Sequence, residues 1–203
     1  AFPAWSHTTA GERQALLIRM AEVIEANLES LSRTLTSEQG KPIADAQAEV
    51  GGAAYFLRYY AGQTIPVELI EDSEVRRIEL HRRPLGVVAA IVPWNFPLNL
   101  SFVPLTYIFA AGNRAMVKMS ENSRHLAKLL MDKMPGYFPR EKLAFFDETG
   151  GVGIEFSKLK FDHIIFTGSG QTGRSVMAAA AANLCPVTLE LGGKAPAVLC
   201  DDF

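Results

Sequence analysis

The chain has 203 residues, and 48% of them are hydrophobic, so it is long enough and apolar enough to bury a sizeable core. Its 20 Lys and Arg residues against 22 Asp and Glu residues give a formal net charge of -2 at pH 7. No basic excess is therefore available to attract a nucleic acid or an anionic lipid surface, and we expect a globular protein that binds neither.

Neither the apolar segments nor the cysteines indicate a membrane or secreted protein. The longest uncharged run, 85–112, is interrupted by prolines, which is wrong for the roughly 20 apolar residues that cross a bilayer. Residues 1–5 show no basic flank followed by an apolar core, so no secretory signal is expected and the cytoplasm is the default location. Cys185 and Cys200 are too few for a disulfide framework and lack a second pair at metal-ligand spacing, which predicts free thiols and no metal site.

The first part of the chain predicts helices. Thr9 and Glu12 have the spacing of a capping box, and apolar residues follow at intervals of three and four as far as Leu35, which predicts one long amphipathic helix. A Gly-Lys-Pro tripeptide at 40–42 ends this helix. A second helix is expected from residue 43 to about residue 62.

Residues 66–83 predict an exposed arm. Between Val75 and Arg83, apolar Ile78 and Leu80 share one face of a strand while charged residues share the other, and a proline then blocks further pairing. A charged strand between helical and buried regions is more often a projecting edge than part of a closed core.

From residue 86 onward, short apolar runs alternate with helical segments. This alternation predicts an α/β fold with a doubly wound, mostly parallel Rossmann-like sheet, in which ligands bind where the strands end at their carboxyl edge. The expected strands are 86–92, 114–119, 143–146, 163–166 and 186–191, and the expected helices are 98–111, 123–134, 151–158 and 171–183.

A stiff turn follows the first of these strands. The segment Pro-Trp-Asn-Phe-Pro at 93–97 uses two prolines to hold one side-chain amide at the carboxyl edge of the sheet. The Asn95 amide can there donate a hydrogen bond to a developing oxyanion. Taken alone, an asparagine in such a turn more often satisfies backbone groups.

Lys118 and Glu121 follow the second strand and are three residues apart. Such a pair can hydrogen-bond the two hydroxyls of a ribose, and the carboxylate would repel a 2′-phosphate, which predicts NAD as the cofactor with NADP as the alternative. A solvated surface pair is the other interpretation of these two residues.

A glycine-rich segment joins the fourth strand to the next helix. Gly168, Gly170 and Gly173 have Gly-x-Gly-x-x-Gly spacing, which lets a pyrophosphate approach the backbone near a helix amino terminus. The ordinary Rossmann fingerprint follows the first strand, so a tight turn alone would also explain these glycines.

Glu190 lies near the end of the fifth strand, in an apolar stretch that is followed by two glycines. The glycines clear space around the carboxylate, which suits a general base. Since a buried glutamate without a function is uncommon, we expect Glu190 to be buried and catalytic.

These four segments together resemble the aldehyde dehydrogenase superfamily in their order and spacing. Three motifs are specific to that family in combination: Pro-Trp-Asn-Phe-Pro at 93–97, Phe-Thr-Gly-Ser at 166–169 and Leu-Glu-Leu-Gly-Gly-Lys at 189–194. The longer Phe-Asp-His-Ile-Ile-Phe-Thr-Gly-Ser segment is most similar to the branch that contains coniferyl-aldehyde and fatty-aldehyde dehydrogenases. The resemblance implies an enzyme that oxidises an aldehyde to a carboxylic acid with NAD or NADP. It implies a dinucleotide-binding domain at 1–65 and 84–203, and an arm at 66–83 that forms a homo-oligomer.

The resemblance also implies roles for individual residues. Asn95 would supply the amide of the oxyanion hole, and Glu190 would activate the water that releases the product. Lys118 and Glu121 would hold the adenosine ribose, with Ser120 beside the adenine. The other residues expected at the cofactor are Pro93, Trp94, Phe166, Thr167, Gly168, Thr172, Leu191 and Gly192, together with Ser169 at the pyrophosphate.

The nucleophilic cysteine of the family belongs well beyond the strand that carries Glu190, and neither Cys185 nor Cys200 matches its motif. The 203 residues are therefore expected to lack the catalytic domain and to be inactive alone. One alternative is a non-catalytic module that binds a dinucleotide or pairs with other subunits. Another is a relative that transfers its acyl group to coenzyme A, against which Glu190 argues.

Overall fold

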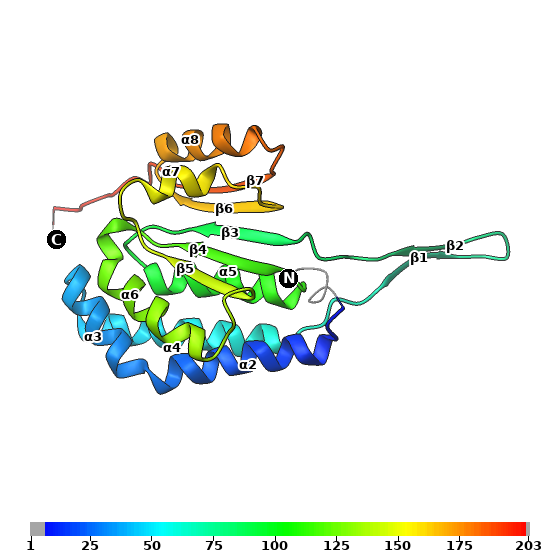
Figure 1. Ribbon diagram of the computed structural model, residues 1–203, viewed down its shortest axis with the longest axis horizontal. Helices are drawn as coiled ribbons and strands as arrows, with labels where there is room; N and C mark the ends of the chain where they lie inside the picture. Colours follow the sequence, from blue (N-terminus) through cyan, green and yellow to red (C-terminus); the bar gives the residue numbers. More distant parts are fainter. Residues whose placement is uncertain (1–6, 202–203) are drawn as a thin grey trace.

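The computed structural model describes residues 7–201, in which a parallel β-sheet carries helices on both faces and a hairpin projects from one end (Figure 1). Residues 1–5, where no signal sequence is expected, lie outside the described range. No helix within residues 7–201 is long and apolar enough to cross a membrane.

The main sheet has five strands, and each lies within two residues of its predicted position. Every neighbouring pair is parallel, in the order β5-β4-β3-β6-β7. The chain starts at the centre, runs to one edge and returns to build the other half, so the strand order reverses between β3 and β6. The predicted doubly wound sheet is confirmed, and it is entirely parallel. The strands are β3 (Val87–Ile91), β4 (Arg114–Lys118), β5 (Leu143–Phe146), β6 (His163–Gly168) and β7 (Val187–Leu191).

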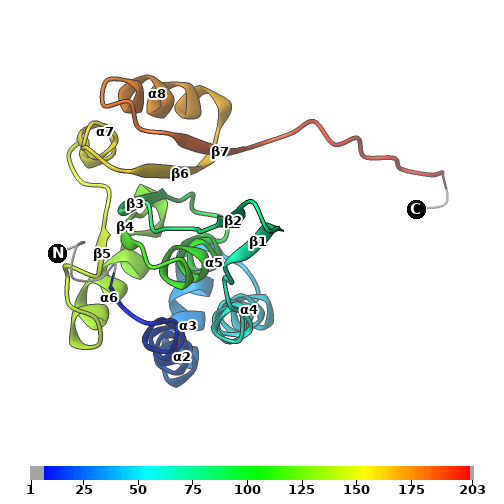
Figure 2. The same cartoon turned by 90° about the vertical axis from the view of Figure 1, so that its right-hand side faces the viewer.

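Alternate residues of the strands supply two separate cores. Val88 and Ala90 of β3 belong to the core on the face of α5 and α6, while Ala89 and Ile91 belong to the core on the face of α7 and α8 (Figure 2). Because successive side chains of a strand point to opposite faces, a strand buried on both faces reads as a continuous apolar run. The helices are α5 (Pro97–Ala110), α6 (Arg124–Lys133), α7 (Val152–Ser157) and α8 (Gly170–Ala181), with short 3-10 turns η1 (Glu121–Ser123) and η2 (Met134–Gly136).

Three further helices, on the α5 side of the sheet, precede the hairpin. The expected capping box is present, because the Thr9 hydroxyl accepts from the Glu12 NH at 3.2 Å and the Glu12 carboxylate accepts from the Thr9 NH at 2.7 Å. The single long helix expected as far as Leu35 is wrong. The chain breaks at Asn27, whose side-chain amide donates to the Val23 carbonyl at 2.7 Å, as asparagine does when it competes for backbone groups at helix ends. The helices are α2 (Ala10–Ala26), α3 (Leu28–Gln39) and α4 (Ile43–Ala61).

The projecting hairpin consists of β1 (Glu68–Asp72) and β2 (Arg77–Leu80), which pair antiparallel. An exposed strand is therefore present where the sequence predicts one, although it is shorter than the segment from Val75 to Arg83. Its partner β1 is not evident from the sequence pattern. Apolar side chains on both strands remain exposed, with Ile70 at 57% and Leu80 at 42%.

Candidate active site

The residues expected to carry chemistry lie at one edge of the sheet, where the parallel strands end (Figure 1). β3 leads into the turn that carries Asn95, β4 ends at Lys118, and β6 leads into Ser169. Glu190 pairs with Thr167 near the ends of β7 and β6. In sheets of this kind the crevice outside the point of strand reversal is where ligands bind, and here that point lies between β3 and β6.

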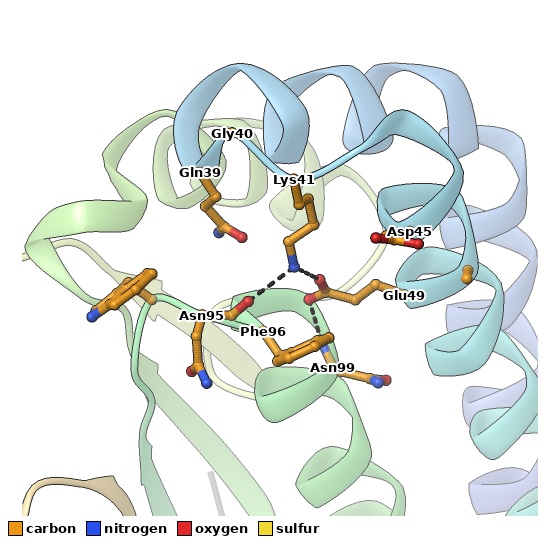
Figure 3. Close-up of a pocket in the computed structure, with 10 residues that line it drawn as sticks. Gln39, Gly40, Lys41, Asp45, Glu49, Asn95, Phe96 and Asn99 are labelled. Carbon is orange, nitrogen blue, oxygen red and sulfur yellow. Dashed lines mark hydrogen bonds and ion pairs between the residues drawn. The ribbon is translucent and has the colours of Figure 1, made fainter. Parts of the chain in front are cut away.

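The turn that carries Asn95 is held by a lysine from another part of the chain (Figure 3). The Lys41 ammonium donates to the Asn95 main-chain carbonyl at 2.9 Å and lies 4.2 Å from the centre of the Phe96 ring. The Asn95 side chain is exposed, and its amide has no hydrogen-bond partner among residues 7–201. The amide is therefore available as a donor while its backbone is fixed.

Glu49 of α4 is the buried partner of Lys41, and its side chain is fully enclosed. Its carboxylate also accepts from the NH groups of Leu98 and Asn99, at 3.0 and 3.1 Å, in the first turn of α5. Free NH groups and the helix dipole favour a negative charge at this end of a helix. One ion pair therefore ties α4, the α3–α4 connection and the Asn95 turn together.

A cavity of about 630 Å³ adjoins this turn. Neither Lys41 nor Glu49 is expected at the site from the sequence, because 40–42 was interpreted only as a helix end. Glu49 lies on the buried, apolar face of α4 next to Val50. A carboxylate on such a face is the sequence feature that indicates a buried ion pair. The cavity is lined by Gln39, Gly40, Lys41, Asp45, Ala48, Glu49, Trp94, Asn95, Phe96 and Asn99.

A second cavity, of about 550 Å³, lies between the ends of β3 and β4 and the helices α7 and α8. It brings together three of the residues expected to bind a cofactor, Lys118, Glu121 and Thr172. Glu148 and several residues of α7 also line it, and the sequence did not indicate them. We call this cavity the cofactor cleft.

Lys118 is buried at the end of β4 and forms an ion pair with Glu148. The alternative interpretation of Lys118 and Glu121 as a solvated surface pair is therefore wrong, because Lys118 is buried and its ion-pair partner is Glu148. Burial works against the charged form of Glu148, but hydrogen bonds from Lys118 and the Gly153 NH, together with the Lys118 charge, hold its pKa below the usual value.

Ser120 and Glu121 lie where β4 gives way to η1. The Ser120 side chain is buried and accepts from the Asn122 NH at 3.2 Å, so it caps η1. The Ser120 hydroxyl lies 3.3 Å from the Glu121 carboxylate, which remains exposed on the cofactor cleft. Glu121 therefore lines, with an exposed carboxylate, the same cleft that Lys118 borders.

Ser169 is the N-cap of α8, as its position between strand and helix predicts. Its hydroxyl accepts from the Thr172 NH at 3.2 Å and lies 2.9 Å from the Thr172 hydroxyl. Gly173 is buried and packs closely on β7, because a Cβ at this position would lie 3.0 Å from the Leu191 side chain. The glycine thus lets α8 pack closely against the end of β7, and Thr172 in its first turn lines the cofactor cleft.

Glu190 is exposed, so the burial expected from its apolar neighbours is wrong. The reason is the two-residue period of β7: Val187 and Leu189 pack against the core under α8, while Thr188 and Glu190 point to the other face. No element within residues 7–201 buries that part of the sheet. The Glu190 carboxylate is consequently open to solvent beside Thr167.

The other expected cofactor residues differ in exposure. The Phe166 side chain is 3% exposed and belongs to the core under α8, so only its backbone can border a ligand. Leu191 at the end of β7 and Gly192 after it are exposed, and Trp94 is exposed after β3. Pro93, Thr167 and Gly168 are half-buried at the strand ends.

The two cysteines lie outside both cavities. Cys185 precedes β7, at the opposite edge of the sheet from Glu190, and burial with the nearby charge of Asp162 raises the pKa of its thiol. Cys200 is exposed in the segment after β7, which extends away from the sheet (Figure 2). The Cys185 thiol therefore lacks the surroundings that favour a reactive thiolate.

Comparison with known proteins places the sequence among aldehyde dehydrogenases. A model of the aldehyde dehydrogenase family matches residues 1–203. A coniferyl aldehyde dehydrogenase from a Pseudomonas species is 50% identical over 117 residues, which cover 58% of this chain and 24% of that protein. An aldehyde dehydrogenase from Deinococcus radiodurans is 38% identical over 100% of this chain and 40% of its own length.

The fold agrees with the same assignment. The crystal structure of PnpE in complex with nicotinamide adenine dinucleotide matches with a TM-score of 0.82 at 34% identity, over 96% of this chain and 41% of that one. The match thus spans about two fifths of the length of the Deinococcus radiodurans protein and of PnpE. The resemblance inferred from the three motifs is confirmed, and the chain belongs to the aldehyde dehydrogenase family.

Proposed function

We propose that the protein containing these residues oxidises an aldehyde to a carboxylic acid with a nicotinamide dinucleotide. The observation that carries the proposal is the gathering of the Asn95 amide, the Glu190 carboxylate and the cofactor cleft at one edge of the sheet. Family membership supports this reaction class, whereas a doubly wound sheet alone would not, since one fold hosts many chemistries. The test is the appearance of reduced cofactor when the full-length protein is mixed with aliphatic and aromatic aldehydes.

The exposed Asn95 amide is assigned the oxyanion role. Addition of a nucleophile to an aldehyde places negative charge on the former carbonyl oxygen, and a fixed NH donor stabilises that charge. The hydrogen bond from Lys41 to the Asn95 carbonyl supports this role, because it leaves the turn little freedom to move when charge develops.

Glu190 is assigned the role of general base in the release of product. Its carboxylate would take a proton from the water that attacks the acyl group, and it is open to water on β7. Hydrolytic release fits a carboxylic acid product. Transfer to coenzyme A would require no base for water.

The cofactor cleft has the donor chemistry of a dinucleotide site. Lys118 and Glu121 can hydrogen-bond ribose hydroxyls beside Ser120, and the NH groups at the start of α8 around Ser169 and Thr172 suit a pyrophosphate. A bound nicotinamide ring would accept the hydride of the aldehyde. The residues of this chain would bind and orient the dinucleotide at the sheet edge.

NAD is expected to bind more tightly than NADP, by about tenfold or more in dissociation constant, because the Glu121 carboxylate would repel a 2′-phosphate. Calorimetric titration of the full-length protein with each dinucleotide measures the difference. Equal or tighter binding of NADP would contradict this prediction.

The 203 residues by themselves are expected to oxidise no aldehyde, because neither cysteine lines either cavity. Covalent catalysis needs a thiolate placed to attack the carbonyl carbon. The measurement compares reduced-cofactor formation by the chain and by a Cys185→Ala, Cys200→Ala double variant. Turnover that disappears in the double variant would identify one of these thiols as the nucleophile and refute the expectation.

We assign the hairpin of β1 and β2 to the pairing of subunits in a homo-oligomer. An isolated two-stranded ribbon is marginally stable in water, and this one exposes apolar side chains on both strands. A second copy of the chain that covers Leu69 and Ile70 would bury these apolar side chains and stabilise the ribbon.

Assembly through the hairpin without catalysis remains the second candidate function. A cytoplasmic location stays a prediction.

A further inference from the structure

The ion pair between Lys118 and Glu148 joins two separate segments at the cofactor cleft. Lys118 ends β4, and Glu148 lies in the connection between β5 and α7. The two side chains are 9% and 19% exposed. Glu148 also accepts from the Gly153 NH, at 2.9 Å through one carboxylate oxygen and at 3.2 Å through the other. The carboxylate therefore has fixed partners on two sides.

Gly153 makes this close approach possible. A Cβ at this position would lie 2.5 Å from the Glu148 carboxylate and 3.0 Å from the Lys118 ammonium, so a larger residue would displace the ends of these two side chains. Glycine at 153 thus lets the ends of both side chains lie against the first turn of α7. The arrangement has the tight packing of a specific contact, in contrast to a solvated surface pair.

Three of the four charged side chains that line the cofactor cleft have an ion-pair partner. The charged residues that line it are Lys118, Glu121, Glu148 and Lys158. Glu148 compensates Lys118, and Lys158 is paired at 2.9 Å with Glu155 outside the lining. Glu121 is the charged residue of the lining that forms no ion pair within residues 7–201. Lys118, which could otherwise attract an additional phosphate, already forms an ion pair with Glu148.

We propose that Glu148 is a specificity-determining residue of the ribose subsite, where it holds Lys118 and thereby disfavours a cofactor that carries a 2′-phosphate. The proposal rests on the proposed function, because it presumes that the cleft binds a dinucleotide. A ribose with two hydroxyls can be bound by Lys118 while the ammonium keeps its contact with Glu148. A 2′-phosphate brings additional negative charge to a cleft that already holds two carboxylates, and like charges placed together oppose binding.

The test is calorimetric titration of the full-length protein with NAD and with NADP, in wild type and in Glu148→Gln. The amide of glutamine can still accept from the Gly153 NH but no longer neutralises Lys118. We expect the dissociation constant of NADP to fall by about tenfold relative to that of NAD. Asp132→Asn removes an exposed carboxylate of α6 whose ion-pair partner Lys128 does not line the cleft, so it should leave the ratio of the two constants unchanged.

Glu148→Ala gives a second variant that removes the charge, and thermal unfolding shows whether each variant is folded. An unchanged ratio of NAD to NADP binding in either folded Glu148 variant overturns the proposal, while NAD binding by the wild type leaves the proposed function standing. If wild type and variants bind neither dinucleotide, the proposed function fails and this inference fails with it.

Discussion

Replacing Glu49 with alanine is expected to lower the free energy of unfolding by about 3 to 5 kcal/mol, the range for breaking a buried ion pair from one side. The variant leaves the Lys41 ammonium without its carboxylate and the NH groups of Leu98 and Asn99 without an acceptor. Buried groups that lose their partners carry the cost of desolvation without compensation. Urea denaturation followed by circular dichroism measures the change.

Asp45→Ala is the matched control for this prediction, because Asp45 lines the same cavity from the first turn of α4 but is exposed. Its loss should cost less than about 1 kcal/mol, the usual contribution of an acidic residue near a helix amino terminus. A loss for Glu49→Ala no larger than the loss for Asp45→Ala would show that the ion pair does not hold the fold together.

Replacing Asn95 with alanine in the full-length enzyme is expected to lower kcat by about a hundredfold to a thousandfold, the cost of removing one oxyanion donor. The dissociation constant for NAD should change little, because the Asn95 side chain does not line the cofactor cleft. Steady-state kinetics and calorimetry on the same preparation separate the two effects.

Asn99→Ala supplies the comparison for Asn95. Both amides line the cavity beside the turn, but Asn99 lies within α5 rather than after β3. An equal fall in kcat for both variants, or no fall for Asn95→Ala, would remove the oxyanion role from Asn95.

The central strand was predictable because it is buried on both faces. Val87–Ile91 reads as an unbroken apolar run, and its alternate residues enter the two cores that lie on opposite faces of the sheet. For Glu190, apolar neighbours in the sequence led to a wrong prediction of burial. Its apolar neighbours Val187 and Leu189 point to the other face, so local hydrophobicity gave no information about the burial of the carboxylate itself.

The paired charges were not predictable, because each joins residues of different structural elements. Lys41 and Glu49 meet at the Asn95 turn through the packing of α4 on α5, and Lys118 meets Glu148 only after β4 and β5 are paired. Sequence periodicity describes one element at a time. It predicts which edge of the sheet collects functional side chains, but it does not tell which of them neutralise one another.

The most direct test of the central claim is hydrogen–deuterium exchange of the full-length protein with and without NAD. If the carboxyl edge of the sheet binds the dinucleotide, NAD should slow exchange at 91–97, 118–123, 147–154 and 166–173. Exchange in the hairpin at 68–80, which lies away from that edge, should not change (Figure 1). Protection confined to the hairpin or to the amino-terminal helices, with none at the four segments, would contradict the account.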